Sequence, residues 1–185
     1  MASVIVPFRA VAAKRRLELP EEARADVAHA MLAQVLAAAL TVGPTILVTE
    51  AEAERARSLA EEHGVDVVDD PGRGQGEAVS AGLARVREWP ALVVNADLPA
   101  VQPRDLLALL GAMPPEGFAI AEAPDGTTNA LALSRPGLFT PLYGPGSAER
   151  FRQHAASLGV ETVTLHVPAL AEDVDSAAGL EKLAS

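Results

Sequence analysis

Apolar positions along the chain fall into short runs separated by longer stretches with helical spacing. The runs at residues 4–7, 45–49 and 65–68 predict strands. Between them, residues 20–40 open with a proline and two glutamates, which favour a helix start, and residues 50–63 predict a second helix. This βαβαβ order is typical of a parallel, doubly wound sheet.

The rhythm changes in the second half of the chain. A helix is predicted at residues 77–88, a strand at 92–96, a short helix at 104–110, a helix at 148–158, a strand at 161–167 and a closing helix at 176–183. In between, residues 118–123 and 129–133 predict two strands joined by Pro124-Asp125-Gly126, which favours a hairpin or mixed pairing. We expect one α/β domain over residues 1–185.

The strand before Asp97 is a continuous apolar run, Ala91 to Ala96, which indicates burial on both faces of a sheet. Ligands in open α/β sheets lie beyond the carboxyl ends of such strands, so Asp97 is a candidate to hold a ligand or a metal. Two structural roles remain open: Asp97 could cap the helix expected near Pro103, or close a turn.

Composition narrows the function classes. With 185 residues, 49% of them hydrophobic, the chain can build one substantial core, and 3% aromatics imply that Ala, Val and Leu fill it. The net charge of −10 argues against general binding to nucleic acid or anionic membranes. No apolar stretch approaching the roughly 20 residues of a membrane span is expected. Without cysteines or a basic secretion signal at its start, the protein is expected to be cytoplasmic.

Two loops that follow predicted strands could bind an anion. The first carries Arg9, Lys14, Arg15 and Arg16 before any acid appears, although a short basic run is also typical of a solvated loop. The second, residues 69–76, places three alternate glycines, Gly72, Gly74 and Gly76, between a strand and a helix, where backbone can approach a ligand closely. This loop lacks the G-x-G-x-x-G spacing of dinucleotide-binding folds, so the alternative that it is a glycine-rich turn without a ligand remains open.

Two further segments bear on anion and metal binding. Asp173 and Asp175 alternate before the closing helix, and carboxylates suit Mg²⁺, although Asp175 could be that helix's cap. Gly144 to Ser147 precedes another helix start, where backbone N–H groups favour an anion and Ser147 could simply be the cap. The four histidines show no metal spacing and no G-x-S-x-G is present, which disfavours zinc enzymes and hydrolases.

Five motifs in one order resemble the 2-phospho-L-lactate or phosphoenolpyruvate guanylyltransferase family of coenzyme F420 biosynthesis. They are Val6-Pro7 with Ala13-Lys14-x-Arg16-Leu17, Asn95-Ala96-Asp97-Leu98-Pro99, Asp125-Gly126-x-Thr128-Asn129-Ala130-Leu131, Gly144-Pro145-Gly146-Ser147 and Asp173-Val174-Asp175. The resemblance implies a nucleotide-diphospho-sugar transferase-like (GT-A, Rossmann-like) α/β fold with a mixed, mostly parallel sheet. It also implies a reaction that joins GTP to a phosphorylated three-carbon acid and releases pyrophosphate.

By position, the resemblance implies a role for each candidate. Asp97, Asp173 and Asp175 would hold Mg²⁺; Thr128, Gly144 and Ser147 would bind the acid; Arg9, Lys14 and Arg16 would face the polyphosphate; Gly72, Gly74 and Gly76 would pack on guanine or ribose. The chain departs from the family at Arg9, at Arg15, at Gln75-Gly76, where members carry Leu-Asn, and at Phe151, where members tend to have histidine.

Several readings of the function stay open. The Ala- and Arg-rich composition favours phosphoenolpyruvate as the acceptor over 2-phospho-L-lactate. A molybdenum-cofactor nucleotidyltransferase is disfavoured because residues 6–17 contain no glycine, and a catalytically silent nucleotide-binding regulator is disfavoured because all three aspartates are present. We expect a monomer or a homodimer.

Overall fold

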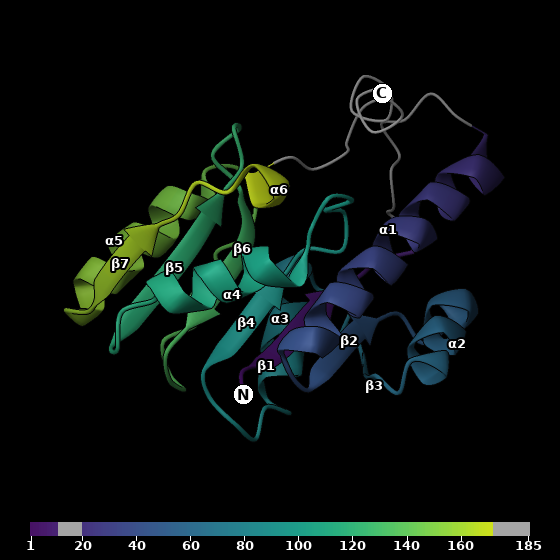
Figure 1. Ribbon diagram of the computed structural model, residues 1–185, viewed down its shortest axis with the longest axis horizontal. Helices are drawn as coiled ribbons and strands as arrows, with labels where there is room; N and C mark the ends of the chain where they lie inside the picture. The colour runs from purple at the N-terminus through teal and green to yellow at the C-terminus, as the bar shows by residue number, and fades with distance from the viewer. Residues whose placement is uncertain (11–19, 172–185) are drawn as a thin grey trace.

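Seven strands form one sheet in the order β3-β2-β1-β4-β6-β5-β7 within residues 1–10 and 20–171, which this computed structural model describes (Figure 1). The strands are β1 (Ser3–Pro7), β2 (Thr45–Thr49), β3 (Asp66–Asp69), β4 (Ala91–Val94), β5 (Gly117–Glu122), β6 (Thr128–Leu133) and β7 (Glu161–Thr164). Each pair of neighbours is parallel except β4–β6 and β5–β6, so β6 alone among these strands runs in the reverse direction. The sheet is therefore mixed and mostly parallel, as predicted.

Helices cover both faces of this sheet (Figure 1). They are α1 (Glu21–Val42), α2 (Glu54–Glu62), α3 (Gln75–Leu83), α4 (Pro103–Ala112), α5 (Ser147–Leu158) and α6 (Pro168–Ala171). Buried residues of α1, α2, α4 and α6 share one core layer, and those of α3 and α5 share the other. Alternate strand residues such as Leu92 and Val93 divide between the two layers, as period-two side-chain alternation requires.

The core is built of Ala, Val and Leu mainly in the first layer. Most of the aromatic side chains gather in the second, where Phe118 and Phe151 are fully buried and Phe139, Tyr143 and Trp89 pack against them. The few aromatics of the chain are thus concentrated beneath α3 and α5.

Element boundaries differ from the predictions at several positions. Helix α2 begins at Glu54 instead of residue 50, because residues 50–53 form a turn in which the Ala53 N–H donates to the Glu50 carbonyl. Helix α3 covers residues 75–83 instead of 77–88, and β7 ends at Thr164. The four-residue α6 was not predicted, because a single turn has too few residues to show periodicity. The predicted closing helix lies outside the described residues.

Helix α1 corrects one expectation about apolar stretches. It has 22 residues and a mean hydropathy of 1.5 over its most apolar window, so by length and composition it could cross a membrane. Half of that window is buried inside the structure, and its residues Leu32, Val35 and Leu36 pack in the first core layer. Packing in the core accounts for the buried half of this apolar window.

Tyr143 is an exception to the apolar packing of the second layer. Its ring lies 5.4 Å from the Phe151 ring, and burial raises the pKa of its phenol. The hydroxyl is buried and has no hydrogen-bond partner among the described residues. An unsatisfied buried polar group costs about 1–3 kcal/mol of stability.

We expect Tyr143→Phe to raise the free energy of unfolding by about 1 kcal/mol, because the ring contacts remain and the unpaired hydroxyl is removed. Urea denaturation of the purified variant beside the parent measures this. A lower unfolding free energy in the variant would show that the hydroxyl is paired.

Candidate active site

The carboxyl ends of the parallel strands form one edge of the sheet, and most candidate segments lie there. Because β1, β2, β3 and β4 are parallel, residues 8–10, 69–76 and 95–97 all follow strands at this edge. Since β6 runs the other way, its first residue, Thr128, also lies at this edge. The predicted convergence of loops at one edge is therefore confirmed for the described segments.

Asp97 lies in the turn after β4 and is half-buried. It does not cap helix α4, because Gln102 occupies the cap position and its N–H donates to Asp105 Oδ2 at 2.9 Å. The helix-cap role is thus excluded, while a turn role remains compatible with its position. Asp97 presents a carboxylate at the edge where ligands bind in folds of this kind.

Arg9 lies near the start of the basic loop, residues 8–17, and its guanidinium pairs with the Asp70 carboxylate. Its Nε donates to Asp70 Oδ2 at 2.6 Å and its Nη2 to Asp70 Oδ1 at 3.2 Å. The Asp70 side chain is 1% exposed and that of Arg9 33%. Next to it, the Ala10 N–H donates to Glu50 Oε2 at 3.0 Å. Two acids therefore fix the entry to the basic loop beside β2 and β3.

The environment of Asp70 favours its charged form. Burial raises the pKa of this carboxyl, but the hydrogen bond from Arg9, the bond from the Gly72 N–H and the charge of Arg9 together outweigh burial. The pKa of Asp70 consequently lies below its ordinary value. Asp70 belongs to the loop of residues 69–76, called the glycine loop below, and its bonds to Arg9 and to the Gly72 N–H join this loop to the basic loop.

The glycine loop lines a cavity of about 350 Å³ together with residues from a distant part of the chain. The lining residues are Arg73, Gly74, Gln75, Gly76, Glu77, Pro141, Tyr143 and Gly144. Gly72 and Gly74 have φ angles of 76° and 108°, in the region that favours glycine. Gly76 serves close packing, because a Cβ there would lie 2.5 Å from the Pro141 Cβ. The structure thus brings Gly74 and Gly76 to the same cavity as Gly144.

Thr128 and Ser147 are in direct contact, 19 residues apart in sequence. The Ser147 Oγ donates to the Thr128 Oγ1 at 3.1 Å, and both side chains are buried. Gly146, not Ser147, occupies the cap position of α5, so the simple cap role for Ser147 is wrong. The Ser147 N–H donates to the Gly144 carbonyl at 3.0 Å. In this arrangement the two hydroxyls fix the 144–147 turn to the start of β6.

Sequence reasoning missed a chain of side-chain amides at the same edge. Gln75 Nε2 donates to Asn95 Oδ1 at 2.7 Å, and Asn95 Nδ2 donates to the Thr128 carbonyl at 3.2 Å. Asn129 is 1% exposed, and its Nδ2 donates to the Leu170 carbonyl at 3.0 Å. An asparagine occurs in both the Asn95–Pro99 motif and the Asp125–Leu131 motif, and this was the sequence signal that could have indicated these hydrogen bonds.

Four candidate residues lie outside the described part of the chain: Lys14, Arg16, Asp173 and Asp175. Within the described residues, no three His, Asp or Glu side chains are grouped so as to hold a metal ion. Asp97 is thus the one member of the predicted carboxylate set that the structure describes.

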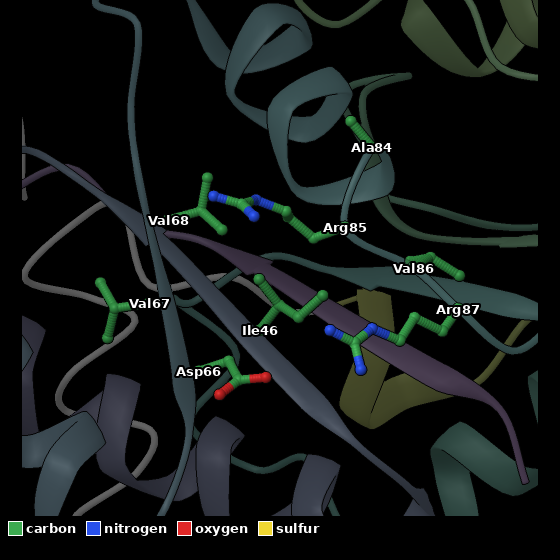
Figure 2. Close-up of a pocket in the computed structure, with 8 residues that line it drawn as sticks. All are labelled: Ile46, Asp66, Val67, Val68, Ala84, Arg85, Val86 and Arg87. Atoms are coloured by element: carbon green, nitrogen blue, oxygen red, sulfur yellow. The ribbon is translucent and has the colours of Figure 1, made fainter.

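A second cavity, of about 450 Å³, lies at the opposite edge of the sheet. Figure 2 shows it bordered by Ile46 and Asp66, near the amino ends of β2 and β3, and by Arg85 and Arg87 after α3. None of the candidate residues lines this cavity. The candidate residues that the structure describes therefore lie away from this cavity.

Comparison with known proteins shows which family and which fold the chain is similar to. The family described as "Guanylyl transferase CofC like" matches residues 2–183. A phosphoenolpyruvate guanylyltransferase from Streptomyces scabiei is 35% identical over 190 residues, covering 94% of this chain and 86% of that protein. A 2-phospho-L-lactate guanylyltransferase from Natrialba magadii is 34% identical over 199 residues, covering 96% and 80%.

Among solved structures, a proposed nucleotide-diphospho-sugar transferase from Desulfovibrio desulfuricans superposes with a TM-score of 0.81 at 13% identity. The match covers 98% of this chain and 85% of that one. At this identity the likeness concerns the fold, and it confirms the predicted nucleotide-diphospho-sugar transferase-like architecture.

We expect Asp70→Asn to lower the free energy of unfolding by about 2 kcal/mol at pH 7, because a charged hydrogen-bond partner of Arg9 is lost. A carboxyl whose pKa is lowered by folding stabilises the protein above its unfolded pKa and loses that effect as the pH falls through its folded pKa. The difference between parent and variant should therefore shrink as the pH falls below about 4. Denaturation at a series of pH values measures it.

Asp69→Asn is the matched control, since the Asp69 carboxylate pairs with Arg57 but is 74% exposed. An exposed pair contributes at most about 1 kcal/mol. Equal losses in the two variants would contradict the assigned role of Asp70.

Proposed function

The chain belongs to the CofC-like guanylyl transferase family, and we propose that it joins GTP to phosphoenolpyruvate, giving enolpyruvoyl-2-diphospho-5'-guanosine and pyrophosphate. The observation that carries this proposal is the family match over residues 2–183. The fold supports it, since glycine-loop and Gly144 backbone border one cavity at the ligand-binding edge.

The reaction needs positioning and charge neutralisation more than a nucleophilic side chain. A phosphate oxygen of the acid attacks the α-phosphorus of GTP, the bond from that phosphorus to the oxygen bridging to the β-phosphorus breaks, and pyrophosphate leaves with the electron pair. Both reactants are anions, so nearby cations and N–H donors lower the repulsion between them.

Cationic residues supply part of that neutralisation. The bonds of Arg9 to Asp70 use its Nε and Nη2, and among the described residues no partner takes the Nη1 donors, which we propose for a phosphate. Lys14 and Arg16 follow in the same loop and are proposed to bind the polyphosphate. Gly72, Gly74 and Gly76 precede or open α3, whose first N–H groups favour anionic or polar ligand atoms.

The acid is proposed to bind at Thr128, Gly144 and Ser147. Of these, Gly144 lines the cavity, while the buried hydroxyls of Thr128 and Ser147 hold the turn that carries it. Loss of either hydroxyl should therefore act on acid binding through the position of Gly144.

Mg²⁺ is the metal we propose, with Asp97, Asp173 and Asp175 as its ligands. Asp97 lies at the carboxyl edge. The described residues end at Ala171, two residues before Asp173, and the Ala171 carbonyl accepts a hydrogen bond from Asn129 Nδ2. Carboxylate oxygens fit this hard cation. When bound, Mg²⁺ neutralises charge on the polyphosphate and on the leaving pyrophosphate.

2-Phospho-L-lactate is the second candidate acceptor, because the Natrialba magadii protein of that name is 34% identical to this chain, close to the 35% of the Streptomyces scabiei protein.

With Mg²⁺ and GTP, we expect pyrophosphate release that depends on phosphoenolpyruvate and exceeds the release with 2-phospho-L-lactate or 3-phosphoglycerate. A coupled pyrophosphate assay with each acid measures this. Release with none of the acids would refute the proposed reaction, and faster release with 2-phospho-L-lactate would reassign the acceptor.

We expect Asp97→Asn to fold like the parent and to lose at least about 100-fold in turnover, since a metal ligand loses its charge while its shape is kept. Asp66→Asn, at the opposite edge of the sheet, is the control and should keep parental turnover. Parental activity in the Asp97 variant would leave Asp97 a structural turn residue.

A further inference from the structure

The residues that line the cavity of the glycine loop include one acid, Glu77, in the first turn of α3. Its side chain is 39% exposed, and within the described residues its ion pair is with Arg73, whose Nη2 lies 3.9 Å from Glu77 Oε2. That distance is too long for a hydrogen bond, and the Arg73 side chain is itself 74% exposed. Such a pair is weak, so the Glu77 oxygens are accessible to a ligand in the cavity.

The other walls of this cavity suit a flat, uncharged ring. Pro141 and Tyr143 provide apolar surface, while Gly74 and Gly76 present backbone without side chains. Gly76 packs directly on Pro141, because a Cβ at position 76 would lie 2.5 Å from the Pro141 Cβ. The volume of about 350 Å³ falls within the roughly 300–1,000 Å³ that is typical of small-molecule sites. A heteroaromatic base matches this combination of apolar wall, bare backbone and one polar group.

The charge of Glu77 decides which part of the reactants can approach it. The triphosphate of GTP and the phosphorylated acid are both anionic, so contact with a carboxylate is unfavourable for either of them. A cation is available at the opposite end of the glycine loop, where Arg9 pairs with Asp70. The base is the uncharged part of the nucleotide, and it is the group that Glu77 can contact favourably.

The hydrogen-bonding edge of a base determines how well a carboxylate binds it. Guanine presents two adjacent donors, N1–H and the N2 amino group, and the two oxygens of an ionised carboxylate accept from both. Adenine presents the N1 lone pair at this edge, and uracil presents carbonyls on both sides of its N3–H, so each brings an acceptor against the carboxylate. A polar site discriminates strongly in this way, because the wrong base leaves its groups unpaired.

Resting on the proposed function, we propose that Glu77 selects guanine by accepting hydrogen bonds from the N1–H and the N2 amino group of GTP. The base lies in the cavity between the glycine-loop backbone and the wall of Pro141 and Tyr143. Glu77 takes no part in the transfer of the nucleotide, and its contribution is to the choice of base.

Calorimetric titration with GTP, ITP and XTP, with Mg²⁺ present and no acid added, tests this assignment. The three nucleotides carry the same triphosphate, so the ratios of their dissociation constants report on the base edge. The base of ITP lacks the N2 amino group, and the base of XTP has a carbonyl there. We expect the parent to bind GTP about 10-fold more tightly than ITP, because a hydrogen bond to a charged group is lost, and to bind XTP most weakly.

Glu77→Gln should shift the preference from GTP toward XTP. The amide oxygen accepts from N1–H and the amide nitrogen donates to the xanthine carbonyl, whereas the same nitrogen meets the guanine N2 amino group donor to donor. The affinity for GTP relative to XTP should therefore fall by at least about 10-fold. Glu77→Asp keeps the carboxylate, and it should keep the parental order of the three nucleotides.

Glu54→Gln is the matched control, because Glu54 also lies in the first turn of a helix, α2, and does not line the cavity. It should keep the parental ratios of affinity. If Glu77 only stabilised the start of α3 through the helix dipole, Glu77→Gln would keep these ratios as well. Parental ratios in Glu77→Gln, an equal shift in Glu54→Gln, or a parent that binds the three nucleotides equally or not at all would overturn the proposal.

The outcome is separable from the proposed reaction. If the parent prefers GTP and Glu77→Gln shifts the preference toward XTP, the selection of guanine by Glu77 stands even where no tested acid supports pyrophosphate release. If the parent releases pyrophosphate from GTP but Glu77→Gln keeps the parental ratios, the reaction stands and the role of Glu77 fails.

Discussion

The reversed strand β6 is the constraint on which the site depends. Inserted antiparallel between β4 and β5, it places its amino end at the edge where the parallel strands end. The register pairs Val94 with Ala130, so Asn95 and Asn129 meet one step further along. A parallel strand at this position would put Thr128 and Asn129 at the opposite edge. The amide chain and the Thr128–Ser147 contact both follow from this single reversal.

Among the described residues, the edge assembled in this way presents mainly backbone and amide groups, and the charges of Arg9 and Asp70 are paired with each other. Asp70 holds Arg9, Glu50 holds the Ala10 N–H, and glycines with positive φ shape the cavity wall. For a chain with a net charge of −10, the basic segment from Arg9 to Arg16 concentrates positive charge at one place. Such a site is suited to orienting two anions for phosphoryl chemistry, where positioning and electrostatics contribute most.

Sequence patterns predicted the succession of strands and helices along the chain, because apolar runs and helical spacing are local signals, and the parallel βαβ units implied the edge at which the loops meet. They also placed the hairpin of β5 and β6, since Pro124-Asp125-Gly126 is a local turn signal. The side-chain partners were beyond reach: Arg9 and Asp70 are 61 residues apart, and Asn129 and Leu170 are 41 apart. Such contacts depend on the register of the strands and on their neighbours in the sheet, and no local pattern encodes either.

The central claim is that GTP with its metal binds at the carboxyl edge of the sheet. Amide hydrogen exchange followed with and without GTP and Mg²⁺ tests it most directly, residue by residue. The account predicts slower exchange at residues 72–76, 95–98 and 128–129, with residues 46, 66 and 84–87 around the opposite cavity unchanged. Slower exchange confined to that opposite cavity, or none in either region, would contradict it.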